Sequence, residues 1–124
     1  MTGRRAARRQ ALTLLYQWDV TGQPFASLYE GDLDPFAAAL AEEVTEHASG
    51  LDERISAASQ DWTAERLGTI ERNVLRMAIL ELDRGDVPVE VAISEAVSLA
   101  KRFASADAAV LVNGILGRIA REAA

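Results

Sequence analysis

The sequence predicts an all-α protein, a compact bundle of about six or seven helices. Apolar residues recur at spacings of three and four along most of the chain, which is the period of an amphipathic helix. No segment alternates between polar and apolar residues for long enough to indicate a strand. The chain has 124 residues, of which 49% are hydrophobic and 26% charged, and this is enough for one domain with a buried core.

The first predicted helix runs from Arg4 to Val20. It is expected to end there because residues 21–24, Thr-Gly-Gln-Pro, favour a turn. The apolar side of this helix consists of Ala7, Ala11, Leu14, Leu15 and Trp18.

The second predicted helix begins at Pro35 and extends to about Ser49. Asp34 is suited to accept hydrogen bonds from the first backbone N–H groups, and proline is favoured at the first helical position. The inner side of this helix consists of Phe36, Leu40 and Val44.

Gly50 is expected to break or kink the chain after the second helix. A shorter helix that holds Leu51 and Ile55 should follow it. Trp62 and Leu67 then flank a short turn of helix.

Two strongly periodic helices follow in the second half of the chain. Thr69 can cap the first of them, and the turn at residues 85–88, Gly-Asp-Val-Pro, separates it from the second. The first apolar stripe is Ile70, Val74, Leu75, Ala78, Ile79 and Leu82. The second stripe is Val89, Ala92, Ile93, Ala96, Val97, Ala100 and Phe103.

Ser105 or Asp107 can cap the last predicted helix. Gly114 and Gly117 lie inside this helix, where each glycine costs about 1 kcal/mol relative to alanine. Close helix packing is the expected reason for both glycines, and approach of an RNA backbone is the alternative. The apolar side of this helix consists of Leu111, Val112, Ile115, Leu116 and Ile119.

Positive charge is concentrated in the first nine residues, although the chain as a whole carries a formal net charge of −6. Arg4, Arg5, Arg8 and Arg9 contribute +4, whereas residues 10–62 carry −9 and residues 63–124 carry −1. Guanidinium groups bind phosphate oxygens in pairs, and neutralised phosphates release condensed counterions. We therefore expect these groups to be free in solution and to bind nucleic acid.

An aromatic ring continues the row of arginines on the first predicted helix. At about 100° per residue, Arg5, Arg9, Leu12 and Tyr16 follow one line along it. Arginines for phosphates and a ring for an unstacked base are what single-stranded RNA requires. The alternative is a solvated helix end with Tyr16 at the edge of the core. RNA or DNA binding is favoured because cations at a helix N-terminus oppose the macrodipole.

The composition excludes several kinds of site. The chain has no cysteine and one histidine, His47, so a disulfide framework and a thiolate metal site are impossible and a histidine metal site is not expected. No stretch approaches the roughly 18 apolar residues of a membrane span, and the start lacks the apolar region of a signal peptide. We expect a cytoplasmic protein with no membrane partner.

Four sequence blocks occur in a characteristic order. The first block lies in residues 4–18, which begin with RRAAR and end with LLYQW, and the second is IERNVLRMA at 70–78. The third consists of DVP at 86–88, VAISEAV at 91–97 and LAKRF at 99–103, and the fourth is VNGIL at 112–116. In this order the blocks resemble the NusB family of bacterial transcription antitermination factors. The resemblance covers most of the chain and is weakest from about residue 23 to residue 60.

The resemblance implies one RNA-binding domain, residues 1–124, made of two small helical bundles at roughly 1–62 and 63–124. NusB-like proteins pair with the ribosomal small-subunit protein NusE, and the pair binds the boxA element of nascent RNA. The complex joins other Nus factors on RNA polymerase and favours complete transcription of ribosomal RNA operons. The resemblance implies neither catalysis nor a cofactor.

The resemblance also implies which residues bind. Several fall on family positions that contact or approach RNA, and Arg9 adds a charge where relatives can carry an acid. Glu71 falls on a position associated with the contact to the ribosomal protein. We expect that Arg5→Glu or Arg8→Glu abolishes boxA binding and leaves the helices intact. The expected RNA-binding residues are Arg4, Arg5, Arg8, Arg9, Tyr16, Phe103 and Asp107.

The last helix departs from the family pattern. Where the family often carries serine, lysine and an aromatic residue, this chain has Ala108, Val110 and Leu111. The missing lysine and aromatic ring remove a charge and a stacking surface. RNA binding is therefore expected to depend more on the first helix and to be weaker or less selective.

Two other functions stay open. The chain could be a helical protein–protein interaction or dimerisation module, in which the arginine-rich helix lies against an acidic protein or a second copy. It could also be the N-terminal domain of an RNA methyltransferase, because the same fold is appended to ribosomal RNA cytosine methyltransferases. The sequence has no Gly-rich cofactor loop, so methyl transfer cannot reside in it.

Overall fold

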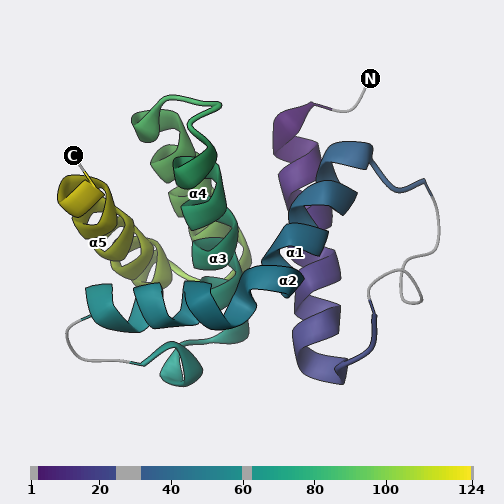
Figure 1. Ribbon diagram of the computed structural model, residues 1–124, viewed down its shortest axis with the longest axis horizontal. Helices are drawn as coiled ribbons and strands as arrows, with labels where there is room; N and C mark the ends of the chain where they lie inside the picture. Colours follow the sequence, from purple (N-terminus) through teal and green to yellow (C-terminus); the bar gives the residue numbers. More distant parts are fainter. Residues whose placement is uncertain (1–2, 25–31, 60–62, 124) are drawn as a thin grey trace.

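The computed structural model describes residues 3–24, 32–59 and 63–123, and in these residues it contains five α-helices and one short 3-10 helix. This confirms the all-α prediction, with fewer helices than the six or seven expected. In Figure 1, α3 and α4 lie between α1 on one side and α5 on the other. The elements are α1 (Arg4–Thr21), α2 (Pro35–Ala58), η2 (Ala64–Arg66), α3 (Thr69–Arg84), α4 (Val89–Phe103) and α5 (Ala106–Ala123).

Helix α1 begins and ends close to the predicted residues, but its N-terminus lacks the features that usually stabilise a helix end. Gly3 is the N-cap and supplies no side-chain hydrogen bond, and the first turn contains no acidic residue. At the other end Gly22 adopts a φ of 74°, and its N–H donates to the carbonyl of Trp18. The arginines of the first turn therefore oppose the helix dipole without compensation from a cap.

Helix α2 begins as predicted but does not break. One carboxylate oxygen of Asp34 accepts hydrogen bonds from the N–H groups of Phe36 at 2.8 Å and Ala37 at 3.3 Å. The helix continues through Gly50 to Ala58, so a break and a separate shorter helix are wrong, and a kink was the other expected outcome. Figure 1 shows that α2 changes direction along its length. Hydrogen bonding thus carries the helix across a residue of low helix propensity.

The side chain of Gln10 joins α1 to the start of α2. Its Nε2 donates to the carbonyl of Asp32 at 3.0 Å, and its Oε1 accepts from the N–H of Asp34 at 2.8 Å. The residue that caps α2 is therefore fixed to α1 through its own backbone.

Helix α3 is the central helix, and residues 73–81 are buried along its whole middle section. Its N-cap is Gly68 rather than the predicted Thr69, which is the first helical residue. The N–H of Gly68 donates to Oε2 of Glu71 at 3.0 Å. A Cβ at position 68 would meet that carboxylate, so the Glu71 side chain would have to move if another residue replaced this glycine. The predicted short helical turn before α3 is η2, and Trp62 lies outside the described residues.

A polar network joins α1, α2 and α3. Oδ2 of Asp19 accepts hydrogen bonds from Arg72, Asn73 and Arg76 at 2.8 to 3.2 Å. Arg76 also donates to both carboxylate oxygens of Asp52 at 2.7 Å. Burial by itself raises the pKa of Asp19, but hydrogen bonds from Arg72 and Asn73 and the charges of the two arginines outweigh it and lower the pKa.

The buried hydrophobic residues form one cluster to which all five α-helices contribute. This cluster contains residues from both sides of residue 62 and so does not divide the chain there. The two small bundles therefore stay a prediction. Large side chains at the centre of the cluster are Leu14, Leu15, Leu40, Ile55, Leu75, Ile79 and Leu116.

Helix α5 is capped by Ser105 and not by Asp107. The Oγ of Ser105 accepts a hydrogen bond from the N–H of Ala108 at 3.0 Å. Close helix packing does not explain the two glycines of this helix. A Cβ at Gly114 would meet nothing within 4 Å, and one at Gly117 would meet a guanidinium of α5 itself, 3.3 Å away.

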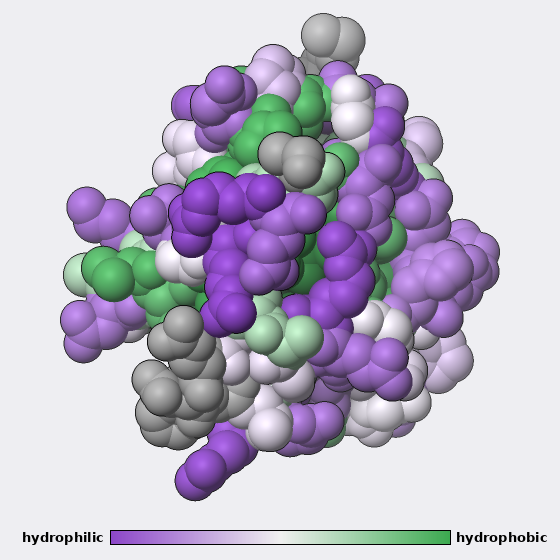
Figure 2. All heavy atoms as spheres, turned by 60° about the vertical axis from the view of Figure 1, so that its left-hand side comes forward, coloured by the Kyte–Doolittle hydropathy of each residue, from purple (hydrophilic) through white to green (hydrophobic). Residues whose placement is uncertain are grey.

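The face of the molecule seen in Figure 2 is mostly hydrophilic. This view brings forward the side on which α5 lies. Hydrophilic residues cover most of it, and hydrophobic residues are visible between them. None of the helices in the described ranges is long and apolar enough to cross a membrane.

Candidate nucleic-acid interface

The two arginines in the first turn of α1 contact different neighbours. The guanidinium carbon of Arg4 lies 3.9 Å from the centre of the Phe36 ring on α2. The Nε of Arg5 instead donates to Oε1 of Glu95 on α4 at 2.9 Å. Both arginines are exposed, and 79% of the Arg5 side chain is accessible in spite of its ion pair. The arginine-rich segment therefore presents charge on two sides of α1.

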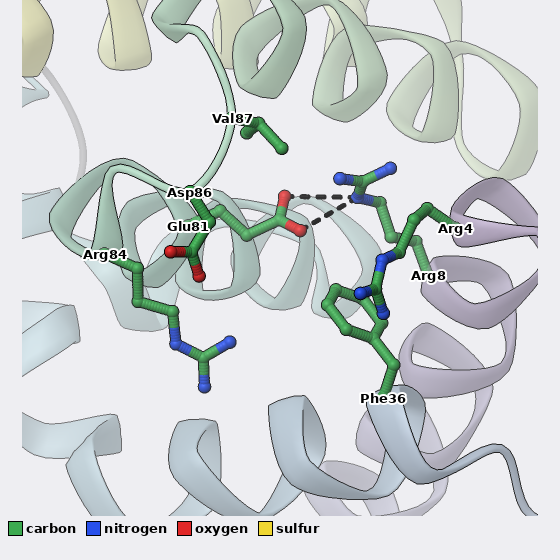
Figure 3. Close-up of a pocket in the computed structure, with 7 residues that line it drawn as sticks. All are labelled: Arg4, Arg8, Phe36, Glu81, Arg84, Asp86 and Val87. Carbon is green, nitrogen blue, oxygen red and sulfur yellow. Dashed lines mark hydrogen bonds and ion pairs between the residues drawn. The ribbon is translucent and has the colours of Figure 1, made fainter.

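Arg8 is buried, so the expectation that it is free in solution is wrong. Its Nε donates to both carboxylate oxygens of Glu81 on α3, at 2.9 and 3.2 Å. Only 6% of the Arg8 side chain and 8% of the Glu81 side chain are exposed. The Nη atoms of Arg8 make no hydrogen bond within the described ranges, and the dashed lines of Figure 3 run from Glu81 to Nε alone. The guanidinium is therefore held through Nε, and its Nη atoms keep their hydrogen-bond donors.

A groove between α1 and α4 brings three of the predicted arginines together. Arg102, which is exposed at the end of α4, adds a fourth guanidinium, and Glu95 adds a carboxylate. We call this hollow of about 370 Å³ the arginine groove. Its excess of positive charge suits a phosphate backbone. The groove is lined by Arg5, Arg8, Arg9, Glu95, Ser98, Leu99 and Arg102.

A second hollow joins the two predicted aromatic residues. Tyr16 and Phe103 are each 43% exposed and line a hollow of about 190 Å³, which we call the aromatic hollow. Arg9 lines both this hollow and the arginine groove, so the two adjoin at this residue. Charge for phosphates is therefore next to rings on which an unstacked base can lie. The aromatic hollow is lined by Arg9, Leu12, Thr13, Tyr16, Ile70 and Phe103.

Arg4 lines a third pocket, which Figure 3 shows between α1, α2 and α3. Arg84 in this pocket forms an ion pair with Glu43 of α2. Arg8 lines both this pocket and the arginine groove. The structure therefore does not place Arg4 in the groove with the other three predicted arginines. The pocket has a volume of about 190 Å³ and is lined by Arg4, Arg8, Phe36, Glu81, Arg84, Asp86 and Val87.

The remaining predicted residues lie outside the two hollows. Asp107 is exposed in the first turn of α5, and Glu71 is partly buried at the start of α3, where it caps the helix. Val110 is 73% exposed, whereas Leu111 packs against the core. The loss of the family's lysine thus leaves an apolar side chain on the surface of α5.

The prediction included Phe103 at the end of α4 but missed the residues of this helix that line the arginine groove. Glu95, Ser98 and Arg102 follow one another at spacings of three and four, so they lie on one face of the helix that ends beside Phe103. This spacing was visible in the sequence. What the sequence did not show is that this face lies opposite the arginines of α1. No cluster of three or more potential metal-ligating side chains occurs in the residues that the structure describes.

Comparisons with known proteins show which family the chain belongs to. The sequence profile described as the NusB family matches residues 5–121. The transcription antitermination protein NusB of Solibacter usitatus is 36% identical over 133 aligned positions, which cover 98% of this chain and 91% of that protein. The NusB structure from T. maritima is similar with a TM-score of 0.87 and 33% identity, over 98% of this chain and 92% of that one.

A solved complex is also similar. It is a crystal structure of the antitermination factors NusB and NusE with double-stranded RNA, and its matching chain has a TM-score of 0.83 and 28% identity. The match covers 96% of each chain.

Proposed function

Because this chain belongs to the NusB family, we propose that it is a transcription antitermination factor that binds RNA. The observation that carries the proposal is that the arginine groove and the aromatic hollow adjoin at Arg9, which lines both. Guanidinium groups attract phosphates, and Tyr16 and Phe103 offer exposed rings for bases. The RNA is expected to be single-stranded and of the boxA type.

The proposed binding residues do not contribute in the same way. Arg5, Arg9 and Arg102 supply accessible charge, whereas Arg8 supplies the Nη end of a fixed guanidinium. Arg4 stacks on Phe36 and contributes long-range attraction from outside the groove. Asp107 lies at the start of α5 and carries no positive charge, so it can contact RNA only as an acceptor for base or ribose donors.

The ribosomal small-subunit protein NusE is the proposed protein partner, since a solved NusB–NusE complex with RNA has the same fold. Glu71 is the proposed contact residue. It is partly exposed, although one of its oxygens already caps α3. We propose that the pair acts in the cytoplasm with other Nus factors on RNA polymerase. The proposal contains no catalytic step and no cofactor.

A titration of labelled boxA RNA tests this function. This chain alone, NusE alone and their mixture are compared over a range of salt concentrations. We expect the mixture to bind more tightly than either protein, and the affinity to fall as salt rises. Equal affinity of the mixture and of NusE alone would contradict the proposal.

Light scattering measures the mass of the particles in the same samples and distinguishes RNA binding from the main alternative, a dimerisation module. If the arginine-rich helix serves dimerisation, the chain without RNA is a dimer and adding RNA leaves its mass per particle unchanged. An RNA-binding monomer instead gains the mass of one RNA.

A further inference from the structure

The arginine groove contains a carboxylate that a surface made for phosphates does not need. Glu95 lies among four guanidinium groups, and 15% of its side chain is exposed. Like charges repel, so this carboxylate lowers the affinity of the groove for phosphate. Its presence therefore needs another explanation.

The geometry of Glu95 keeps one of its oxygens available. The Nε of Arg5 donates to Oε1 at 2.9 Å, which fixes the carboxylate against the groove. Within the described part of the chain, Oε2 accepts no hydrogen bond. Besides its ion pair with Arg5, Glu95 thus places a fixed acceptor oxygen at a hollow of about 370 Å³, where a ligand can donate a hydrogen bond to it.

We propose that Glu95 selects an RNA base that bears an amino group, cytosine above all. The inference rests on the RNA-binding function proposed above and names the base that the groove prefers. A carboxylate accepts a hydrogen bond from N4 of cytosine, whereas the equivalent position of uracil is the acceptor O4, which repels it. In this proposal Arg9 and Arg102, which line the same groove, hold phosphates, and the base edge meets Glu95.

Binding of oligo(C) and oligo(U) tests the proposal. Both are used at a length of about 12 nucleotides, within the usual site sizes of proteins that bind single strands. Equal length gives equal numbers of phosphates, so any difference in affinity comes from the base. The natural chain is expected to bind oligo(C) about fivefold more tightly or better, which corresponds to one specific base contact.

Two variants separate charge from base recognition. Glu95→Gln removes the charge and keeps an acceptor oxygen, while Glu95→Ala removes both. Both variants should bind oligo(U) more tightly than the natural chain, because the repulsion of phosphate is gone and uracil makes no favourable contact with Glu95. Only Glu95→Ala should lose the preference for oligo(C) completely. Glu90→Ala is the control, since it removes an exposed acid of α4 outside the groove and should keep the preference.

The outcomes are distinct. Equal affinity of the natural chain for the two oligonucleotides overturns the proposal and leaves the RNA-binding function intact. The same is true if Glu95→Ala keeps the preference. If the natural chain binds neither oligonucleotide, and no boxA RNA when NusE is present, the proposed function fails and this inference fails with it.

Discussion

Arg8 and Glu81 form a buried ion pair between α1 and α3, in which one Nε donates to two carboxylate oxygens at 2.9 and 3.2 Å. The pair lies between the arginine groove and the pocket of Figure 3. Arg8 is therefore a structural residue and a candidate ligand-binding residue at the same time. Substitutions at this position must be interpreted with both roles in mind.

Loss of one partner of this pair should strongly destabilise the protein. We expect Arg8→Met to lower the free energy of unfolding by about 3–5 kcal/mol, because it leaves the Glu81 carboxylate buried without a partner. Arg5→Met is the matched control and should change it by less than about 1 kcal/mol, since Arg5 is largely exposed. Urea unfolding measures both, and equal small losses would show that the ion pair is not buried in solution.

The sequence-based expectation for Arg8→Glu changes accordingly. Two carboxylates would face each other inside the protein, so we now expect the helices to lose stability together with RNA binding. Arg5→Glu remains the substitution that should weaken RNA binding in a folded protein. Far-ultraviolet circular dichroism of the two variants distinguishes these results.

The exposed rings should contribute to RNA affinity and not to folding. We expect Tyr16→Ala and Phe103→Ala each to lower the affinity for single-stranded RNA about fivefold or more, the effect of one lost base stack. Tyr16→Phe should retain the affinity because it keeps the ring. Val20→Ala, which trims an exposed apolar side chain of α1 outside the aromatic hollow, is the control. Undiminished binding by both alanine variants would place the RNA elsewhere.

Arg102 should contribute to binding through charge alone. We expect Arg102→Ala to weaken RNA binding at low salt and to reduce the slope of log affinity against log salt by about 0.7, the value for one phosphate contact with a single strand. Arg121→Ala removes an exposed charge in the last turn of α5 and should leave the slope unchanged. The affinity of both variants is measured at several salt concentrations, and an equal slope for the two would contradict a phosphate contact by Arg102.

Asp19 should make stability depend on acid pH. Its pKa is lowered below the ordinary value of 3.8, so the stabilisation is complete above that value and is lost as pH falls through the lower folded pKa. We expect Asp19→Asn to cost at least about 1.5 kcal/mol at neutral pH, the size of a hydrogen bond to a charged group. The difference between variant and natural chain should shrink as the pH is lowered to about 3. A difference that stays constant in urea unfolding at both pH values would contradict this assignment.

Gly114→Ala should stabilise the protein. The added Cβ meets nothing within 4 Å, so the variant should gain up to about 1 kcal/mol of helix propensity. Thermal unfolding measures the gain, and a loss of stability would restore the explanation by close helix packing. A gain in stability with a loss of RNA affinity would instead indicate that RNA approaches the backbone of α5.

The sequence predicted best those features that local chemistry decides. Asp34 before a proline and Gly22 after an apolar stripe indicated helix ends that the structure has. Gly50 misled the prediction because helix propensity is a weak preference, and packing of Leu51 and Ile55 in the core holds the helix together across it.

The features that escaped prediction depend on residues far apart in the chain. Periodicity places Arg8 on α1 but gives no information about Glu81, which comes 73 positions later. For the same reason the ion pair between Arg5 and Glu95 could not be predicted. The binding residues of α1 were thus found from the sequence, whereas the groove that they form with α4 required the arrangement of helices.

The hydrogen bonds of Gln10 have a practical consequence for protein engineering. They fix the residues just before α2 to α1, so the position of α2 does not depend on the length of the connection between the two helices. The entropic cost of a longer connection grows slowly, by about 0.6 kcal/mol for each doubling. A longer connection between the two helices should therefore leave the hydrogen bonds of Gln10 to the start of α2 intact.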